Sequence, residues 1–119
     1  MTKHYYLSIA TNVLHQNDGA TNFFLDYYLL EQQVTGDNGI GLMGYGVEIV
    51  KRMNNGDKSE ISDQIAIGDI FFSKPQTIEF INQLAHNCVT PTTLLDVVED
   101  VLNDQEAYPN TLKFLPKAV

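Results

Sequence analysis

The sequence has 119 residues, of which 44% are hydrophobic and 18% charged, and its formal net charge is −8. This length and composition predict a single globular domain that can build one core without metals or disulfides. The one cysteine excludes an intramolecular disulfide, and no apolar run approaches the roughly 20 residues of a membrane span. Since no charged-then-apolar leader begins the chain, we expect a soluble, cytoplasmic protein.

The acidic residues are concentrated in the second half of the chain. Residues 59–119 carry nine acids against three lysines, whereas residues 1–58 carry six acids against four basic residues. Binding to a phosphate backbone requires clustered lysine and arginine, and only Lys51 and Arg52 are adjacent. Nucleic acids and anionic membranes are therefore not expected partners.

Three Xaa-Gly dipeptides, Asp18-Gly19, Asn38-Gly39 and Asn55-Gly56, divide the first seventy residues. Such pairs supply the positive φ angles of tight hairpin turns. The segments between them are rich in aromatic and β-branched residues, which predicts four strands. Their expected ranges are 4–14, 21–34, 41–53 and 59–67. The second segment also fits a helical stripe, but its aromatic doublets favour a strand.

Alternation along these strands assigns side chains to two faces. One face is expected to carry the odd positions of the first three strands, from Tyr5 and Leu7 onward, with Ile61, Ile65 and Ile67 from the fourth. If this face meets the helices, the opposite face becomes a candidate interaction surface that a second copy of the chain could cover. Its expected members are Tyr6, Phe24, Tyr28, Leu30, Leu42, Gly44 and Gly46.

The apolar spacing changes to a helical period after residue 72. Ser73-Lys74-Pro75-Gln76 has the form of a capping box, and Asn87 is a plausible helix end. Cys88 continues the apolar stripe of this helix and is expected to be buried. Thr90-Pro91 begins a second helix, whose predicted apolar stripe is Leu94, Leu95, Val98, Val101 and Leu102.

These elements predict an α+β fold, a four-stranded antiparallel meander sheet followed by two C-terminal helices packed on one face. A single domain is expected over 1–119. It divides into a β-meander (1–72), a helical pair (73–106) and a tail (107–119), of which 111–115 is apolar enough to pack back onto the domain.

Two sequence patterns resemble ligand-binding sites, one for a dinucleotide and one for a cation, but both are better explained by a structural role. Gly39-Ile40-Gly41-Leu42-Met43-Gly44 matches the dinucleotide motif G-x-G-x-x-G, but a strand rather than a helix is expected to follow it. The glycines then mark a turn and a bulge or close approach. The second pattern is a set of carboxylates on the final helix, which could bind a cation but also fits a solvated face or an acidic partner surface. These carboxylates belong to Asp96, Glu99, Asp100 and Asp104.

The segments Tyr45-Gly46-Val47-Glu48-Ile49, Ile61-Ser62 and Val89-Thr90-Pro91 are similar to stretches of a family of small proteins of unknown function. The similarity continues through Leu94-Leu95-Asp96-Val97-Val98-Glu99-Asp100, and the family occurs in Gram-positive bacteria. The resemblance implies an intracellular bacterial protein and no particular activity, ligand or catalytic residue.

The function expected first is a non-enzymatic protein-interaction or regulatory module that acts as a homodimer or on another protein. The alternatives are a sensor with an apolar ligand between sheet and helices or over the glycines, and a metal-dependent enzyme using the carboxylates of the last helix. We expect no cofactor, no metal and no catalytic residue.

Overall fold

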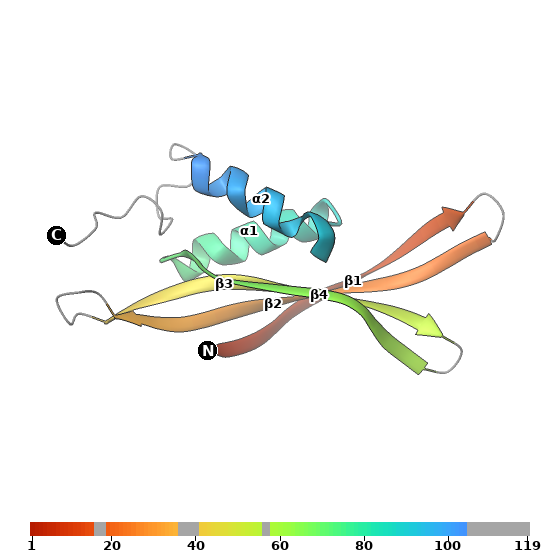
Figure 1. Cartoon of the computed structure of the whole chain (residues 1–119), viewed down its shortest axis with the longest axis horizontal. Helices are drawn as coiled ribbons and strands as arrows, with labels where there is room; N and C mark the ends of the chain where they lie inside the picture. Colours follow the sequence, from red (N-terminus) through yellow and green to blue (C-terminus); the bar gives the residue numbers. More distant parts are fainter. Residues whose placement is uncertain (16–18, 36–40, 56–57, 105–119) are drawn as a thin grey trace.

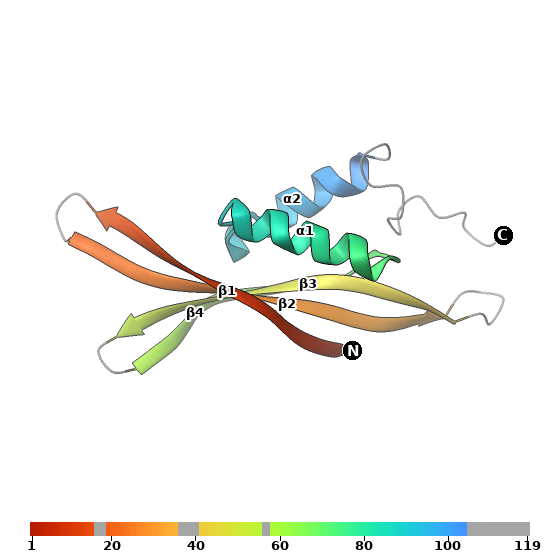
Figure 2. The ribbon, with the colours of Figure 1, turned by 180° about the vertical axis from the view of Figure 1, so that it is seen from behind.

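The computed structural model describes residues 1–15, 19–35, 41–55 and 58–104. Four strands form one antiparallel sheet in the order β1-β2-β3-β4: β1 (Thr2–His15), β2 (Gly19–Thr35), β3 (Gly41–Asn55) and β4 (Lys58–Phe71). The helices α1 (Lys74–His86) and α2 (Pro91–Asn103) lie together on one face of this sheet (Figure 1, and from behind in Figure 2). The predicted α+β meander with two C-terminal helices is confirmed.

The second segment is a strand along its whole length, so the helical alternative is wrong. Its odd-numbered side chains from Phe23 to Leu29 are buried beneath the helices. Strand alternation brings all four of these side chains to one face, whereas a helix would spread them around its axis. The core is completed by side chains of α1 and α2, among them Phe80, Ile81, Leu84, Leu94 and Val98.

The sheet has four strands only in its middle. The pairing of β2 with β3 begins at Phe23 and Met53, whereas β1 continues along β2 to His15 and β3 continues along β4 to Asn55. Beyond that pair the two hairpins separate, as Figure 1 shows at the end of the sheet away from the helices.

A bulge in β1 changes which side of the sheet its first residues face. Tyr5 lies opposite Tyr28 and Leu7 lies opposite Tyr27, so Tyr6 is the additional residue. One extra residue reverses the alternation on one side of it. Tyr6 therefore packs against the core cluster, while Tyr5 projects from the opposite face. The predicted sides of these two tyrosines were wrong.

A second bulge, in β4, has the same effect on Ile61. Arg52 pairs with Ile61 while Lys51 pairs with Asp63, so Ser62 is unpaired. Ile61 thus turns away from the face of Ile65 and Ile67 and is 60% exposed. The strand also runs to Phe71, four residues beyond its predicted end, and the Phe71 ring packs edge-on against Phe80 at 5.3 Å.

The ends of α1 lie where the sequence predicts them. The Ser73 side chain accepts a hydrogen bond from the backbone N–H of Gln76 at 3.3 Å, but Gln76 Oε1 is buried without a partner among the described residues. The capping box is therefore only half formed. Because the helix ends at His86, Cys88 lies in the connection at φ 52° and is exposed rather than buried.

α2 begins at Pro91 after Thr90, as predicted, although the Thr90 side chain makes no capping hydrogen bond. Its buried stripe contains Leu94, Val98 and Val101, whereas Leu95 is 50% exposed. The predicted tail contact at 111–115 lies outside the described residues, as do parts of the three Xaa-Gly turns.

Tyr27 ties the sheet to the connection between the two helices. Its buried hydroxyl donates to the Val89 carbonyl oxygen at 2.8 Å. Burial, with a smaller contribution from the neighbouring Cys88, raises the pKa of Tyr27 far above its ordinary value of 10.0, so the hydroxyl remains a donor.

We expect Tyr27→Phe to lower the free energy of unfolding by about 1–2 kcal/mol, because it leaves a partly buried carbonyl without its donor. Urea denaturation measures this loss. Tyr45→Phe is the matched control, since no described hydrogen bond uses the Tyr45 hydroxyl. Equal stability of the two variants would contradict the role assigned to the Tyr27 hydroxyl.

Candidate interaction face

The helices leave one side of the sheet uncovered, and we call this surface the open face. Strand alternation and the two bulges determine its members, because the other face carries the core. In its four-stranded part these are Lys3, Tyr5, Ser8, Ala10, Phe24, Asp26, Tyr28, Leu30, Gly46, Glu48, Val50, Arg52, Ile61, Gln64 and Ala66. Gly44 and Leu42 continue the face along β3.

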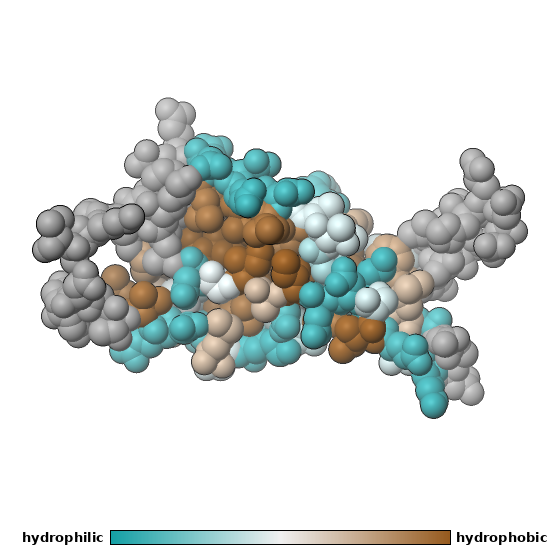
Figure 3. Space-filling model, viewed as in Figure 1, coloured by the Kyte–Doolittle hydropathy of each residue, from teal (hydrophilic) through white to brown (hydrophobic). Residues whose placement is uncertain are grey.

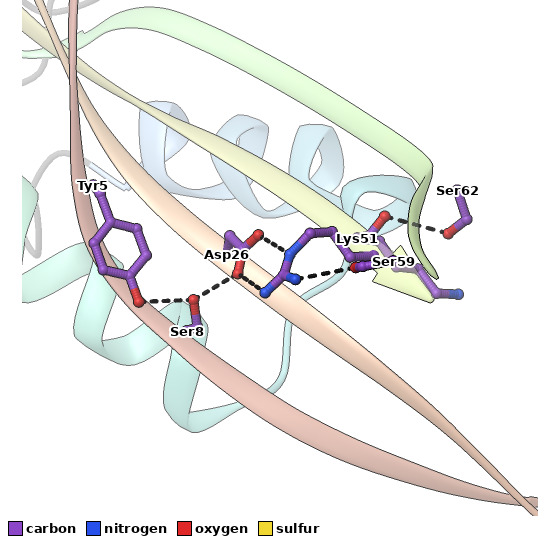
Figure 4. Close-up of polar contacts among 7 residues, drawn as sticks. Tyr5, Ser8, Asp26, Lys51, Ser59 and Ser62 are labelled. Carbon is purple, nitrogen blue, oxygen red and sulfur yellow. Dashed lines mark hydrogen bonds and ion pairs between the residues drawn. The ribbon is translucent and has the colours of Figure 1, made fainter. Parts of the chain in front are cut away.

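A hydrogen-bonded network crosses the open face from β1 to β4 (Figure 4). At its centre is Asp26, a residue that is 4% exposed and whose carboxylate accepts hydrogen bonds from both Nε and Nη2 of Arg52. Asp26 also accepts from the Ser8 hydroxyl at 2.5 Å, and that hydroxyl contacts the Tyr5 hydroxyl at 2.8 Å. Arg52 donates in turn to Ser59 at 3.1 Å.

The charged state of Asp26 is maintained by its partners. Burial alone would raise the pKa of this carboxyl group, but the hydrogen bonds from Arg52 and Ser8 and the positive charge of Arg52 outweigh burial. The pKa of Asp26 is consequently lower than its ordinary value of 3.8, and the pair is ionised at neutral pH.

Cationic side chains cover the aromatic rings of the open face. The Arg52 guanidinium lies 5.1 Å from the centre of the Phe24 ring, and the Lys3 ammonium lies 4.6 Å from that of Tyr28. Lys3 also pairs with Glu48 at 2.9 Å. Phe24 and Tyr28 are thus half-buried and Leu30 is buried, although no helix covers them. The open face, which was expected to be apolar, is a layer of aromatic rings beneath a layer of charged side chains.

The glycine-rich segment has a packing role. A Cβ atom on Gly46 would lie 2.1 Å from the Ile67 carbonyl oxygen, and one on Gly44 would lie 2.5 Å from Asp69 Oδ1. β3 continues through both glycines without a helix after them. The close-approach explanation of these glycines is confirmed. The space directly over Gly44 is occupied by the Asp69 side chain. Gly39 lies outside the described residues.

Asp69 is an unusual residue at the rim of the open face. It has a positive φ of 55° within an irregular part of β4, where Gly68, Asp69 and Ile70 lie opposite Gly46. Its Oδ1 atom is buried and has no hydrogen-bond partner among the described residues. Both features cost free energy, and such costs tend to occur at functional positions.

The predicted acidic residues Asp96, Glu99, Asp100 and Asp104 are all exposed. Figure 3 shows a hydrophilic upper edge at α2 and an apolar area beneath it, toward the sheet. Among the residues described, no group of three or more His, Cys, Asp or Glu side chains lies close enough to hold a metal ion. Neither α1 nor α2 is long and apolar enough to cross a membrane.

Sequence reasoning missed the Asp26–Arg52 pair because the two residues are 26 positions apart. One signal was available, since Asp26 is the only charged residue in the run from Phe23 to Leu30. A carboxylate inside such an apolar strand usually requires a cationic partner.

A sheet of four consecutive antiparallel strands covered on one face by two helices defines a two-layer α+β domain. The chain belongs to DUF6514, a family of unknown function, whose model matches residues 7–104. This match includes both helices and nearly all of the sheet, and it confirms the predicted membership of such a family. Searches of curated proteins and of solved structures gave no significant match.

Proposed function

We propose that this chain is a non-enzymatic protein-interaction module that forms a homodimer through its open face. The observation that carries the proposal is the position of its exposed apolar side chains. Six large hydrophobic residues are exposed among those whose burial the structure describes, and three of them, Tyr5, Leu42 and Ile61, project from the open face. Tyrosine and arginine, which dominate the energetics of protein interfaces, lie between them.

The charge distribution favours a second copy on this face over one on the helices. From residue 74 to 104, one lysine stands against Glu79 and the four acids Asp96, Glu99, Asp100 and Asp104. The open face and its rim combine Lys3 and Arg52 with Asp26, Glu48 and Asp69, so their net charge is close to zero. Two helical layers would repel each other, whereas two open faces would not.

The size of the open face also fits a dimer. Four strands about 4.8 Å apart, each with about nine residues at 3.3 Å, span about 600 Å² before side-chain relief is counted. Standard interfaces bury about 800 Å² of accessible surface per partner. The rigid sheet requires little ordering when it binds, which reduces the entropic cost of association.

The dimer predicts a solution mass of twice 13.4 kDa at tens of micromolar, measured by light scattering after gel filtration. Tyr28→Asp should convert it to a monomer, because a carboxylate would replace an aromatic ring at the centre of the interface and would have to be desolvated there. Ile61→Asp, at an exposed position of the same face, should act in the same direction without disturbing the fold.

Leu95→Asp is the matched control, since Leu95 is equally apolar and half-exposed but lies on α2. It should remain dimeric. A monomeric mass for the unsubstituted chain, or a dimer that survives both open-face substitutions, contradicts the proposal.

We also propose that this module works in a bacterial cytoplasm. The resemblance noted for its strand and helix segments supports this setting. Cys88 is a free, exposed thiol, which fits a reducing compartment.

A further inference from the structure

The register of the sheet arranges the open face in rows that run across all four strands. The first row contains Lys3, Leu30, Gly46 and then the irregular part of β4 with Asp69. The backbone of Asp69 therefore stands at the edge of the row opposite to Lys3, and the Asp69 carboxylate reaches one row further, over Gly44.

In two further rows the residues at opposite edges of the sheet also complement each other. The second runs Tyr5, Tyr28, Glu48, Ala66, and the last four-stranded row runs Ala10, Phe24, Arg52, Ile61. In both, a large side chain at one edge corresponds to alanine at the other, and a central ring on β2 neighbours a charged residue on β3.

A twofold axis parallel to the strands, midway between β2 and β3, exchanges β1 with β4 and β2 with β3 and leaves each row facing itself. Tyr5 then meets Ala66, Ile61 meets Ala10, and Phe24 meets Arg52 of the other copy. Tyr28 meets Glu48, to which its hydroxyl can donate. Two sheets in aligned packing cross at about 30°, so these partners meet to within about one row.

The alternative twofold axis, perpendicular to the strands, reverses the order of the rows. It would place the Lys3 ammonium over Ala10 and the Asp69 carboxylate over Ile61. The Asp69 carboxylate would then be desolvated against an apolar side chain with no cation near it, which is costly, while Lys3 would keep only Glu48 of its own chain. The arrangement of charges thus selects the parallel axis.

We propose that two copies pack with their open faces together about a twofold axis parallel to the strands, and that Asp69 of each copy binds the Lys3 ammonium of the other. This inference rests on the proposed homodimer and specifies its geometry. It also gives the Asp69 carboxylate a cationic partner, which no described residue of its own chain provides.

Crosslinking tests the axis directly. Two variants, Ala10→Cys and Ile61→Cys, are prepared in a Cys88→Ser background and treated with a short bis-maleimide, separately and mixed. Only the mixture should give efficient crosslinking. Identical positions lie at opposite edges of the paired sheets, about 14 Å apart laterally in addition to the spacing of about 10 Å between sheets. If the mixture gave no more crosslinking than either variant alone, the parallel axis would be overturned, because the perpendicular axis places Ala10 over Lys3 and not over Ile61 of the other copy.

Asp69→Asn tests the ion pair while preserving the shape of the residue and its tolerance of positive φ. The dissociation constant of the dimer should rise about tenfold, because two symmetry-related charge pairs are lost. The stability of the monomer should be unchanged or higher, since a buried unpaired charge is removed. Lys3→Met should weaken the dimer in the same way. In the double variant, Lys3→Met with Asp69→Asn, the loss of binding free energy should be smaller than the sum of the losses in the two single variants.

Asp96→Asn on α2 is the control for the general effect of removing a negative charge and should leave the dissociation constant unchanged. A dimer that Asp69→Asn does not weaken would overturn the ion pair, while the homodimer itself would stand. A monomeric mass for the unsubstituted chain is a separate outcome, measured first, and it would overturn the proposed function.

Discussion

Replacing Gly46 with alanine is expected to lower the free energy of unfolding by about 3 kcal/mol or more. The new Cβ would lie 2.1 Å from the Ile67 carbonyl oxygen and 2.6 Å from the Gly68 Cα atom. Both are backbone atoms of the neighbouring strand, so the clash cannot be relieved by a side-chain rotation. Two paired strands would have to separate, which costs more than ordinary overpacking of a core.

Gly41→Ala is the matched control in the same strand. Its Cβ would contact only the flexible end of the Gln33 side chain, which can move away at little cost. Thermal and urea denaturation should therefore separate the two variants clearly. If Gly46→Ala were as stable as Gly41→Ala, the close approach of β4 to β3 would be refuted.

Asp26→Ala is expected to lower the free energy of unfolding by about 2–4 kcal/mol. The substitution leaves Arg52 without its carboxylate and removes the acceptor of the Ser8 hydroxyl. Breaking a buried pair costs about 3–5 kcal/mol. The loss expected here is somewhat smaller, because the Arg52 side chain is partly exposed and can turn toward solvent. The double variant Asp26→Leu with Arg52→Met should recover much of the loss, since it removes both charges together.

The contribution of Asp26 depends on pH with a definite sign. Because its pKa is lower in the folded state, the pair stabilises the protein fully above the ordinary pKa of 3.8. The contribution falls as the pH drops through the lower folded-state pKa. Urea denaturation of the wild type and Asp26→Asn between pH 7 and pH 3 gives the difference in their free energies of unfolding. This difference should become smaller only at the acid end of the range. A constant difference would mean that the charge of Asp26 does not stabilise the fold.

Much of the architecture followed from local patterns. The Xaa-Gly dipeptides and the aromatic alternation placed all four strands in the correct order, because a hairpin turn pairs neighbours along the chain. The Ser73 and Thr90 caps located the starts of both helices. Gly44 and Gly46 were interpreted correctly as a bulge or close approach within a strand, since no helix was expected after them.

The errors came from single-residue shifts in pairing. The extra residues at Tyr6 and Ser62 moved Tyr5 and Ile61 to the open face. No local sequence pattern predicts such bulges. Cys88 was misplaced for a similar reason, because α1 ended just before it.

Local periodicity therefore specified the type and order of the elements, since each depends on neighbours a few residues away. The character of the open face was decided by register. Asp26 meets Arg52, the cations cover the rings, and Lys3 shares a row with Asp69 only because particular residues of distant segments pair across the strands. Such contacts are set by the bulges and by the burial of the opposite face, which exist only once the sheet and helices have assembled.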